Sequence, residues 1–259
     1  MAGLPTAELT GQTVDDEGLF RFLVGHADDN LVLAQRLGEW VSRAPELEED
    51  LALANLALDH LGQARALFTY AAEVQGEGKD EDDLAFLRTE QEFTNKLLVE
   101  QPNGDFAQTM VRQMFFDAYQ LILWEQLSEV ADSRLAGIAA KANKEATYHF
   151  RHSSGWVVRL GDGTDESHRR TQRAVERLWR FTAELFESGE VDAAIGRGIA
   201  DQAERWLSIA EGVLDEATLT IPDDPFQRSG GRAGAHTEHL GHLLSEMQWM
   251  QRTYPGLEW

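Results

Sequence analysis

The sequence predicts an all-α protein, an antiparallel helical bundle with additional C-terminal helices, on three observations. Long proline-free segments carry leucine and aromatic residues at helical spacing, short turns with glycine or proline separate them, and no segment shows the alternating pattern of a strand over a useful length. Four helical segments exceed about twenty residues, and long helices joined pairwise by short turns suit an antiparallel bundle. We therefore expect a single domain over 1–259, with a flexible N-terminus at 1–14.

The first part of the chain predicts two long helices and a shorter one. Residues 15–44 contain no proline and repeat apolar residues at near-helical spacing until Pro45, so they form the first helix. Alanine and leucine occupy nearly every face of the segment at about 46–75, which predicts a helix buried on most sides. The glycine-containing segment 76–80 ends it, and a shorter helix is expected over about 82–100.

Two further long helices complete the predicted bundle. The segment at about 106–131 is too apolar for an exposed element, and a fifth helix follows almost at once over about 134–160. The sequence Gly-Asp-Gly at 161–163 ends the fifth helix, and Thr164 or Asp165 caps the next one.

The C-terminal part predicts helices that pack around the bundle. A helical run is expected over about 191–219, and an amphipathic last helix over about 237–253. Between them, 221–234 is a long irregular stretch that serves as an interface loop or as a connector.

The composition excludes several function classes. A formal charge of −22 disfavours nucleic-acid binding, because phosphates are neutralised by clustered lysine and arginine. The absence of cysteine rules out disulfides and thiolate ligands. No stretch approaches the roughly 18 apolar residues of a membrane span, and the first residues lack the pattern of a signal peptide. We expect a soluble, cytoplasmic protein that binds neither nucleic acid nor membrane.

Acidic residues in the long helices stand where a carboxylate-bridged di-iron bundle holds its ligands, but the histidine partners are missing. Such a site needs Glu-x-x-His twice, because this motif places a carboxylate and an imidazole one turn apart on one helical face. The motif does not occur in the chain. The candidates for a vestigial site are Asp29, Asp59, Asp117, Lys141, Glu145, Tyr148 and His149.

The fifth predicted helix admits two interpretations. Lys141, Glu145, Tyr148, His149 and His152 follow one another at steps of three or four for the most part, so they share a face. One interpretation is a metal site with Glu145, His149 and His152 as ligands, and the other is a set of satisfied polar groups in or beside the core. The second is favoured, because the carboxylates expected from the other helices are all aspartates, which reach less far than glutamates.

Buried carboxylates without a metal need a positive charge or hydrogen bonds, because an isolated buried anion is strongly unfavourable. Lys141 precedes Glu145 by one turn. We hypothesise that its ammonium group takes the place of the metal and holds the carboxylates in an ion-pair network.

Several long segments carry a resemblance to a known family. They are 51–65 (LALANLALDHLGQAR), 97–109 (LLVEQPNGDFAQT), 141–165 (KANKEATYHFRHSSGWVVRLGDGTD), 178–186 (LWRFTAELF) and 236–256 (HTEHLGHLLSEMQWMQRTYPG). On these segments the chain resembles, over nearly its whole length, the C-type structural subunits of bacterial phenylacetyl-CoA epoxidases, which are multicomponent ring-epoxidising monooxygenases.

The resemblance implies a ferritin-like fold and a non-catalytic role, with no catalytic, cofactor-binding or metal-binding residue in this chain. It implies pairing with a catalytic A-type subunit that carries the di-iron centre and binds the aryl-CoA thioester, while a small B-type subunit and a reductase complete the complex. The assembly converts phenylacetyl-CoA to its ring-1,2-epoxide in aerobic phenylacetate breakdown. The alternative is a carboxylate- and histidine-bound di-metal oxidase active in its own right, with the ligands Asp29, Asp59, Asp117, Glu145 and His149.

Overall fold

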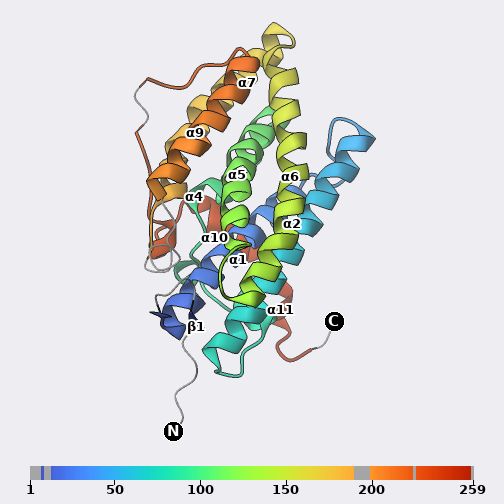
Figure 1. Ribbon diagram of the computed structural model, residues 1–259. Helices are drawn as coiled ribbons and strands as arrows, with labels where there is room; N and C mark the ends of the chain where they lie inside the picture. Colours follow the sequence, from blue (N-terminus) through green and yellow to red (C-terminus); the bar gives the residue numbers. More distant parts are fainter. Residues whose placement is uncertain (1–6, 9–12, 190–198, 224–225, 258–259) are drawn as a thin grey trace. The chain divides into compact units, whose positions relative to one another are not determined.

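The computed structural model describes residues 7–8, 13–189, 199–223 and 226–257, and it confirms the predicted all-α, ferritin-like fold class (Figure 1). Within the N-terminal 14 residues, β1 (Ala7–Glu8) pairs with β2 (Thr13–Val14) in a short antiparallel ladder. Among the described helices, none is both long and apolar enough to cross a membrane.

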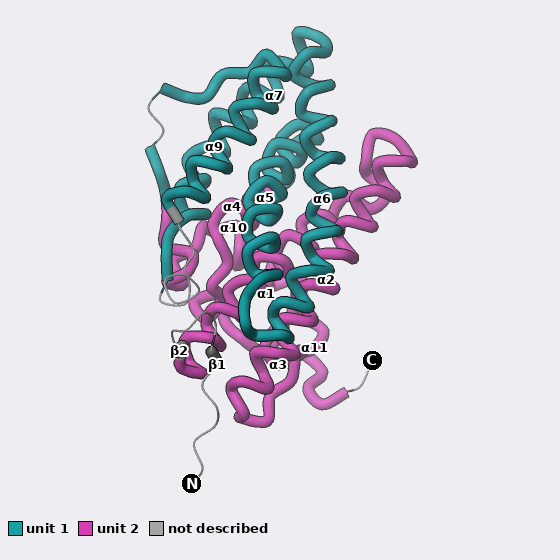
Figure 2. The backbone as a smooth tube through the Cα atoms, in the orientation of Figure 1, with its two compact units in different colours: residues 1–14, 103–228 teal, residues 15–102, 229–259 magenta. Residues whose placement is uncertain are grey.

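The contacts divide the chain into two compact units, and each unit is discontinuous in sequence (Figure 2). Unit 1 comprises Met1–Val14 and Asn103–Arg228, and unit 2 comprises Asp15–Pro102 and Ser229–Trp259. Each unit contains two long consecutive helices that pack side by side. The single domain over 1–259 stays a prediction.

Unit 2 is built on the first two long helices. Its elements are α1 (Asp16–Gly38), α2 (Leu47–Gln75), α3 (Glu81–Phe86), η1 (Glu90–Glu92), α4 (Leu97–Glu100), η4 (Gly231–Ala233), α10 (Glu238–Met247) and α11 (Trp249–Thr253). Asp15 caps α1, since its side chain accepts a hydrogen bond from the Gly18 amide at 2.8 Å. The first helix ends at Gly38 rather than near residue 44, and turns that include Ser42 with φ of 67° lead to α2.

The predicted helix over 82–100 is wrong, because the chain there forms α3, η1 and α4 with extended backbone between them. The Glu92 carboxylate accepts a hydrogen bond from the Thr89 amide at 2.7 Å, which starts the short η1 turn. The extended residues that follow turn the amide groups of Thr94 and Lys96 toward two carboxylates of α1. The break therefore supplies hydrogen-bond donors that a continuous helix would have used internally.

The prediction that the second helix is buried on most sides is also wrong for one of its faces. Leu53, Leu56 and Leu67 of α2 are buried as expected. Four other leucines of the same helix are exposed: Leu47, Leu51, Leu58 and Leu61.

Unit 1 is built on the next two long helices. Its helical elements are α5 (Phe106–Leu127), α6 (Ser133–Gly161), α7 (Asp165–Leu178), η2 (Trp179–Phe181), η3 (Ala183–Phe186) and α9 (Ile199–Glu216). Thr164 caps α7 and accepts from the Ser167 amide at 3.2 Å, one of the two predicted caps. The predicted helix at about 191–219 is described from Ile199 on, and 191–198 lie outside the described residues.

Aromatic side chains tie α9 to α5. The Trp206 indole donates a hydrogen bond to the Phe115 carbonyl at 2.9 Å, and its ring lies 5.7 Å from that of Trp179 and 5.6 Å from that of Phe186, between ring centroids. These contacts bury large apolar area around a satisfied indole N–H group, which stabilises the unit.

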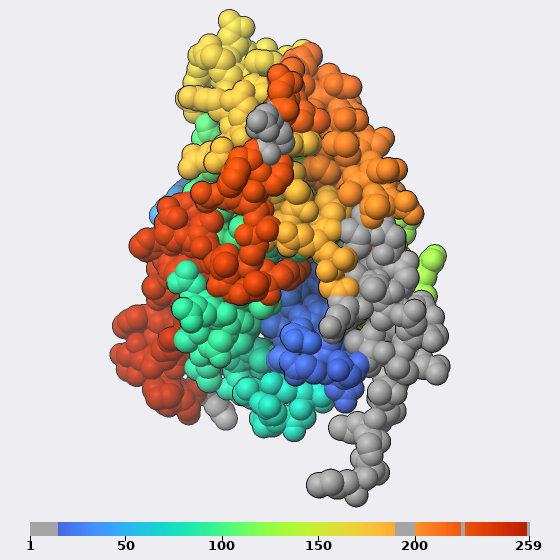
Figure 3. All heavy atoms as spheres, turned by 90° about the vertical axis from the view of Figure 1, so that its left-hand side faces the viewer, coloured from blue at the N-terminus to red at the C-terminus, as the bar shows by residue number. Residues whose placement is uncertain are grey.

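The irregular stretch predicted at 221–234 follows α9. Its described residues 226–229 are exposed, and the segment reaches the surface in orange-red on the side seen in Figure 3. The stretch also contains Arg232, whose side chain enters the interior of unit 2.

Candidate functional site

Asp28 on α1 is a fully buried carboxylate that an arginine neutralises. The Arg88 guanidinium group forms an ion pair with it, with Nη1 at 3.0 Å from Oδ2. The Thr94 amide and hydroxyl donate to the same oxygen at 2.8 and 3.1 Å. The guanidinium also lies over the Phe93 ring, 4.3 Å from its centroid. Charge, hydrogen bonds and a cation–π contact thus hold this buried pair together.

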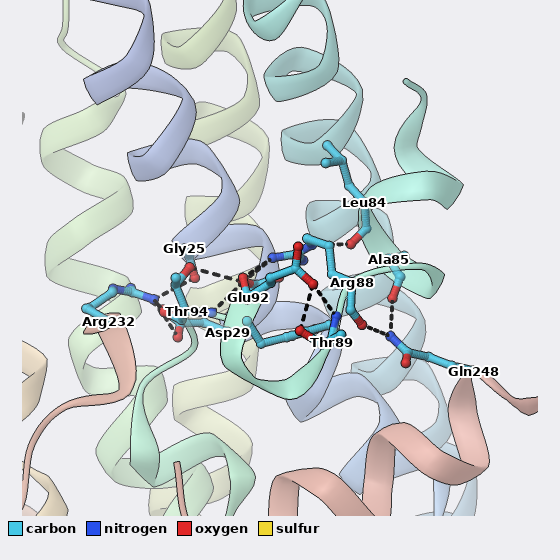
Figure 4. Close-up of polar contacts among 12 residues, drawn as sticks. Gly25, Asp29, Leu84, Ala85, Arg88, Thr89, Glu92, Thr94, Arg232 and Gln248 are labelled. Atoms are coloured by element: carbon cyan, nitrogen blue, oxygen red, sulfur yellow. Dashed lines mark hydrogen bonds and ion pairs between the residues drawn. The ribbon is translucent and has the colours of Figure 1, made fainter. Parts of the chain in front are cut away.

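Asp29, the next residue of α1, is bound by Arg232 from the irregular segment (Figure 4). Arg232 donates through Nη2 to Oδ2 at 2.6 Å and through Nη1 to Oδ1 at 3.1 Å, and the Lys96 amide donates to Oδ1 at 2.6 Å. Arg232 also donates to the Gly25 and Thr94 carbonyls. Burial raises the pKa of Asp29, and the guanidinium group opposes that shift.

A glycine makes room for this arginine. A Cβ atom at position 25 would lie 3.0 Å from Nη1 of Arg232, which is tighter than ordinary packing. Gly25 therefore lets the guanidinium group lie against the backbone of α1 and reach its carbonyl.

Glu100 at the end of α4 is the third buried carboxylate of unit 2. Its side chain accepts from His236 Nδ1 at 2.9 Å and from the Thr237 amide at 2.6 Å. His236 Nε2 faces the Phe93 carbonyl at 2.8 Å, so both ring nitrogens meet acceptors and the ring suits the doubly protonated form. Burial alone lowers the pKa of His236, but the hydrogen bonds with Glu100 and the Phe93 carbonyl outweigh it and raise the pKa.

Asp117 on α5 is a fully buried carboxylate of unit 1. Ser153 of α6 donates to Oδ2 at 2.7 Å and Gln113 donates to Oδ1 at 3.2 Å. A ring nitrogen of the buried His149 lies within 4.8 Å of its carboxylate. Burial raises the pKa of Asp117 to about 6, although His149 and the two hydrogen bonds counteract the shift.

The predicted polar face of the fifth helix, α6, divides into an inner and an outer part. His149 is fully buried, whereas Tyr148 is 45% exposed and stacks near Arg151. Lys141 is paired with Glu145 at 3.4 Å, as its spacing predicts, but its side chain is 74% exposed. The hypothesis that Lys141 replaces a buried metal's charge is therefore wrong, because its ammonium group stays in water.

The prediction for α2 is off by one position. Asp59 is only partly buried, whereas its neighbour His60 is fully buried and its Nδ1 lies 2.8 Å from Oδ1 of Asn30 on α1. One residue turns a helix by about 100°, so the inward direction passes from the carboxylate to the imidazole.

The donor groups do not fit a di-iron centre. Both Asp29 oxygens are occupied by Arg232 and the Lys96 amide, and both Asp117 oxygens accept from Ser153 and Gln113. A di-iron bundle of this class uses glutamates and the Glu-x-x-His pair, which the sequence lacks. The arrangement suits carboxylates kept by internal partners.

A cavity of about 620 Å³ opens in unit 2 beside the arginines. Its charged lining residues are Arg21, Lys79, Asp83, Arg88, Glu92 and Arg232. Since Arg88 and Arg232 donate to Asp28 and Asp29, positive and negative charges around the cavity balance. Such a cavity does not select a strongly anionic ligand.

Sequence reasoning predicts Asp29 and Asp117 as buried carboxylates but misses the residues that neutralise and extend the network: Asp28, Arg88, Glu100, Arg232 and His236. A local signal exists only for Arg232, which lies between glycines in SGGRAG. Gly230 and Gly234 take φ of 125° and 76°, which form the tight turn that presents the arginine.

Comparison with known proteins identifies the family. The sequence model described as "Phenylacetic acid catabolic protein" matches residues 5–259. The chain belongs to this family. One relative, the C-type subunit of the 1,2-phenylacetyl-CoA epoxidase of Escherichia coli (strain K12), is 54% identical over 237 residues, which cover 90% of this chain and 95% of the relative. The resemblance drawn from the sequence segments is confirmed for this member of the phenylacetic acid catabolic protein family.

Proposed function

We propose that this chain is the C-type structural subunit of a phenylacetyl-CoA 1,2-epoxidase and acts in phenylacetate breakdown in the cytoplasm. The observation that carries the proposal is the 54% identity to the C-type subunit of such an epoxidase, over 95% of that relative's length. A similarity that spans almost the whole relative includes its surfaces as well as its core, so a shared place in an assembly is the simplest explanation.

The chain is non-catalytic in this proposal, and the di-iron centre belongs to the partner A-type subunit. The buried carboxylates support this assignment, because Asp29 is neutralised by Arg232 and Asp117 accepts from Ser153 and Gln113. The alternative of a di-metal oxidase needs these oxygens as ligands. It also needs Asp59 in the interior, where His60 lies instead.

The buried ion pairs give the chain its structural role. Asp28, Asp29 and Glu100 connect α1 and α4 to residues far along the sequence, up to 203 positions away for the Arg232 pair. Buried charges that are fully paired specify one arrangement, because a shifted segment would leave an unpaired charge in the interior. Such a rigid scaffold suits a subunit that supports the A-type subunit, with the small B-type subunit and the reductase completing the complex.

The test is co-expression of the A-type subunit with and without this chain. We measure soluble A-type subunit and the epoxide formed from phenylacetyl-CoA in the presence of the B-type subunit and the reductase. We expect soluble, active A-type subunit only when this chain is present. Full turnover by the A-type subunit without it contradicts the proposal.

A variant separates the structural role from the alternative of a di-metal oxidase. Asp117→Asn keeps the shape of the side chain but removes a carboxylate that the oxidase would need. We expect complexes with this variant to turn over phenylacetyl-CoA at the rate of the unmodified complex. Loss of turnover in an intact complex favours the oxidase.

A further inference from the structure

The exposed face of α2 carries a row of leucines that the described part of unit 2 does not cover. Leu47, Leu51, Leu58 and Leu61 are between 42% and 71% exposed. A helix that is apolar all round normally has both faces buried. Within unit 2, the opposite face of α2 packs on α1. That face therefore has a packing partner in the described part of the unit, whereas the leucine row has none there.

The spacing of the row indicates which kind of surface covers it. The positions are 47, 51, 54, 58, 61 and 65, which alternate steps of four and three. Leucine occupies the first, second, fourth and fifth of them, Ala54 the third and Arg65 the last. This is the heptad pattern of a helix that packs lengthwise against another helix. The leucines extend over about 21 Å of helix, at about 1.5 Å per residue.

Gly62 lies beside this row and leaves the backbone bare. It is exposed, and a Cβ atom built there would meet nothing within 4 Å. Glycine inside a helix is less favourable than alanine by about 1 kcal/mol. A bare position next to Leu61 lets the backbone of another helix approach closely, as small residues do in helix packing.

The charge of the chain argues against a second copy as the occupant. Each copy carries a formal charge of −22, so two copies repel each other. The row is bordered by the exposed Glu48 and the partly buried Asp50 and Asp59. The complementary surface is therefore an apolar helix flanked by lysine or arginine, on a different and less acidic protein.

We propose that the outer face of α2, from Leu47 to Arg65, is the docking surface for a helix of the catalytic A-type subunit. This inference rests on the proposed function and adds the surface that carries the pairing. Leu51 and Leu58 are the central knobs, and Gly62 is the point of closest backbone approach. Specific interfaces bury about 800 Å² per partner, so the row forms the apolar centre of a larger contact.

The first experiment measures the affinity of the A-type subunit for variants of the full chain by light scattering and calorimetry. The double variant Leu51→Gln, Leu58→Gln is compared with a control that changes two exposed leucines elsewhere, Leu87→Gln, Leu257→Gln. Both replace exposed leucines by a good helix former. We expect the α2 variant to bind at least about 30-fold more weakly, the loss typical of central interface residues, and the control to bind like the unmodified chain.

The second experiment uses glycine. Gly62→Ala and Gly212→Ala each fill an open position in an exposed part of a helix, so both leave the melting temperature of the isolated chain unchanged or raised. We expect only Gly62→Ala to weaken the complex.

The outcomes separate the two proposals. If the unmodified chain binds the A-type subunit and the α2 variants bind equally well, the docking surface is wrong while the structural role stands. The same conclusion follows if the control variants lose as much affinity as the α2 variants. If the unmodified chain does not bind the A-type subunit at all, both proposals fail.

Discussion

Replacing Arg232 with methionine tests the buried ion pair that joins α1 to the irregular segment. Arg232→Met keeps the length and apolar stem of the side chain but leaves Asp29, which is 1% exposed, without its guanidinium partner. Breaking one side of a buried ion pair costs about 3 to 5 kcal/mol. The Gly25 and Thr94 carbonyls also lose a hydrogen-bond donor in this variant. We therefore expect Arg232→Met to lower the free energy of unfolding by about 3 to 5 kcal/mol, and not by less.

The assay is urea denaturation of the purified chain at pH 8 and at pH 5, monitored by circular dichroism. Burial already raises the pKa of Asp29, and without Arg232 only the smaller contributions of the Lys96 amide and the Lys96 charge oppose the shift. A carboxyl whose folded pKa exceeds its unfolded value destabilises the folded state above that pKa, and the penalty is relieved as the pH falls. The difference in unfolding free energy between Arg232→Met and the unmodified chain is therefore smaller at pH 5 than at pH 8.

A double variant and a surface control isolate the charge effect. Asp29→Asn combined with Arg232→Met removes both charges, and we expect it to recover about 2 kcal/mol relative to Arg232→Met alone. Arg205→Met breaks an ion pair with Glu125 in which both side chains are about half exposed, and it should cost less than about 1 kcal/mol. The reasoning is refuted if Arg232→Met costs no more than Arg205→Met, or if the double variant gains nothing.

Three further predictions follow from the buried groups. The pKa of His236 is raised in the folded state, so its contribution to stability is present in full below the unfolded pKa and is lost as the pH rises through the folded pKa. His236→Gln should therefore lose the most unfolding free energy, relative to the unmodified chain, near pH 6. A loss that grows toward pH 9 contradicts this. The shift of the Asp117 pKa from 3.8 to about 6 corresponds to a penalty of about 3 kcal/mol in the free energy of unfolding above pH 6. Asp117→Asn should therefore be at least as stable as the unmodified chain at pH 8 and less stable than it at pH 4.5. Urea melts in which the variant is the less stable protein at pH 8 and the more stable one at pH 4.5 argue against this reasoning. A Cβ atom at Gly161 would lie 2.4 Å from the Ala217 carbonyl oxygen, so Gly161→Ala should lower the free energy of unfolding by about 1 to 3 kcal/mol. A Cβ atom at Gly155 of the same helix would meet nothing within 4 Å, so Gly155→Ala should not destabilise the chain. Equal melting temperatures for the two variants refute the packing argument.

The long helices can be predicted from the sequence because their apolar spacing and their stops are local signals. The Gly-Asp-Gly turn at 161–163 and the Thr164 cap follow from the sequence for this reason. The break within 82–100 cannot be predicted in the same way. It depends on Asp28 and Asp29, which lie more than 60 positions earlier and draw the amides of Thr94 and Lys96 out of a helix.

The candidate site can be predicted in part. The burial of Asp29 and Asp117 can be predicted, because both residues lie among apolar neighbours in the sequence. The cations that meet them follow from tertiary structure, and a single sequence does not indicate that Arg232 pairs with a residue 203 positions away. Leucines surround both Asp59 and His60, so the hydrophobic pattern of α2 gives no inward direction and does not distinguish the two.

The metal content of the purified chain tests the central claim of a non-catalytic subunit most directly. The chain is reconstituted anaerobically with iron and with manganese and analysed by mass spectrometry beside a known di-iron protein. A chain whose buried carboxylates are kept by Arg232, Ser153 and Gln113 should hold well under one metal ion. A content of about two metal ions per chain, as in a di-iron carboxylate protein, would contradict the account and make this subunit an oxidase in its own right.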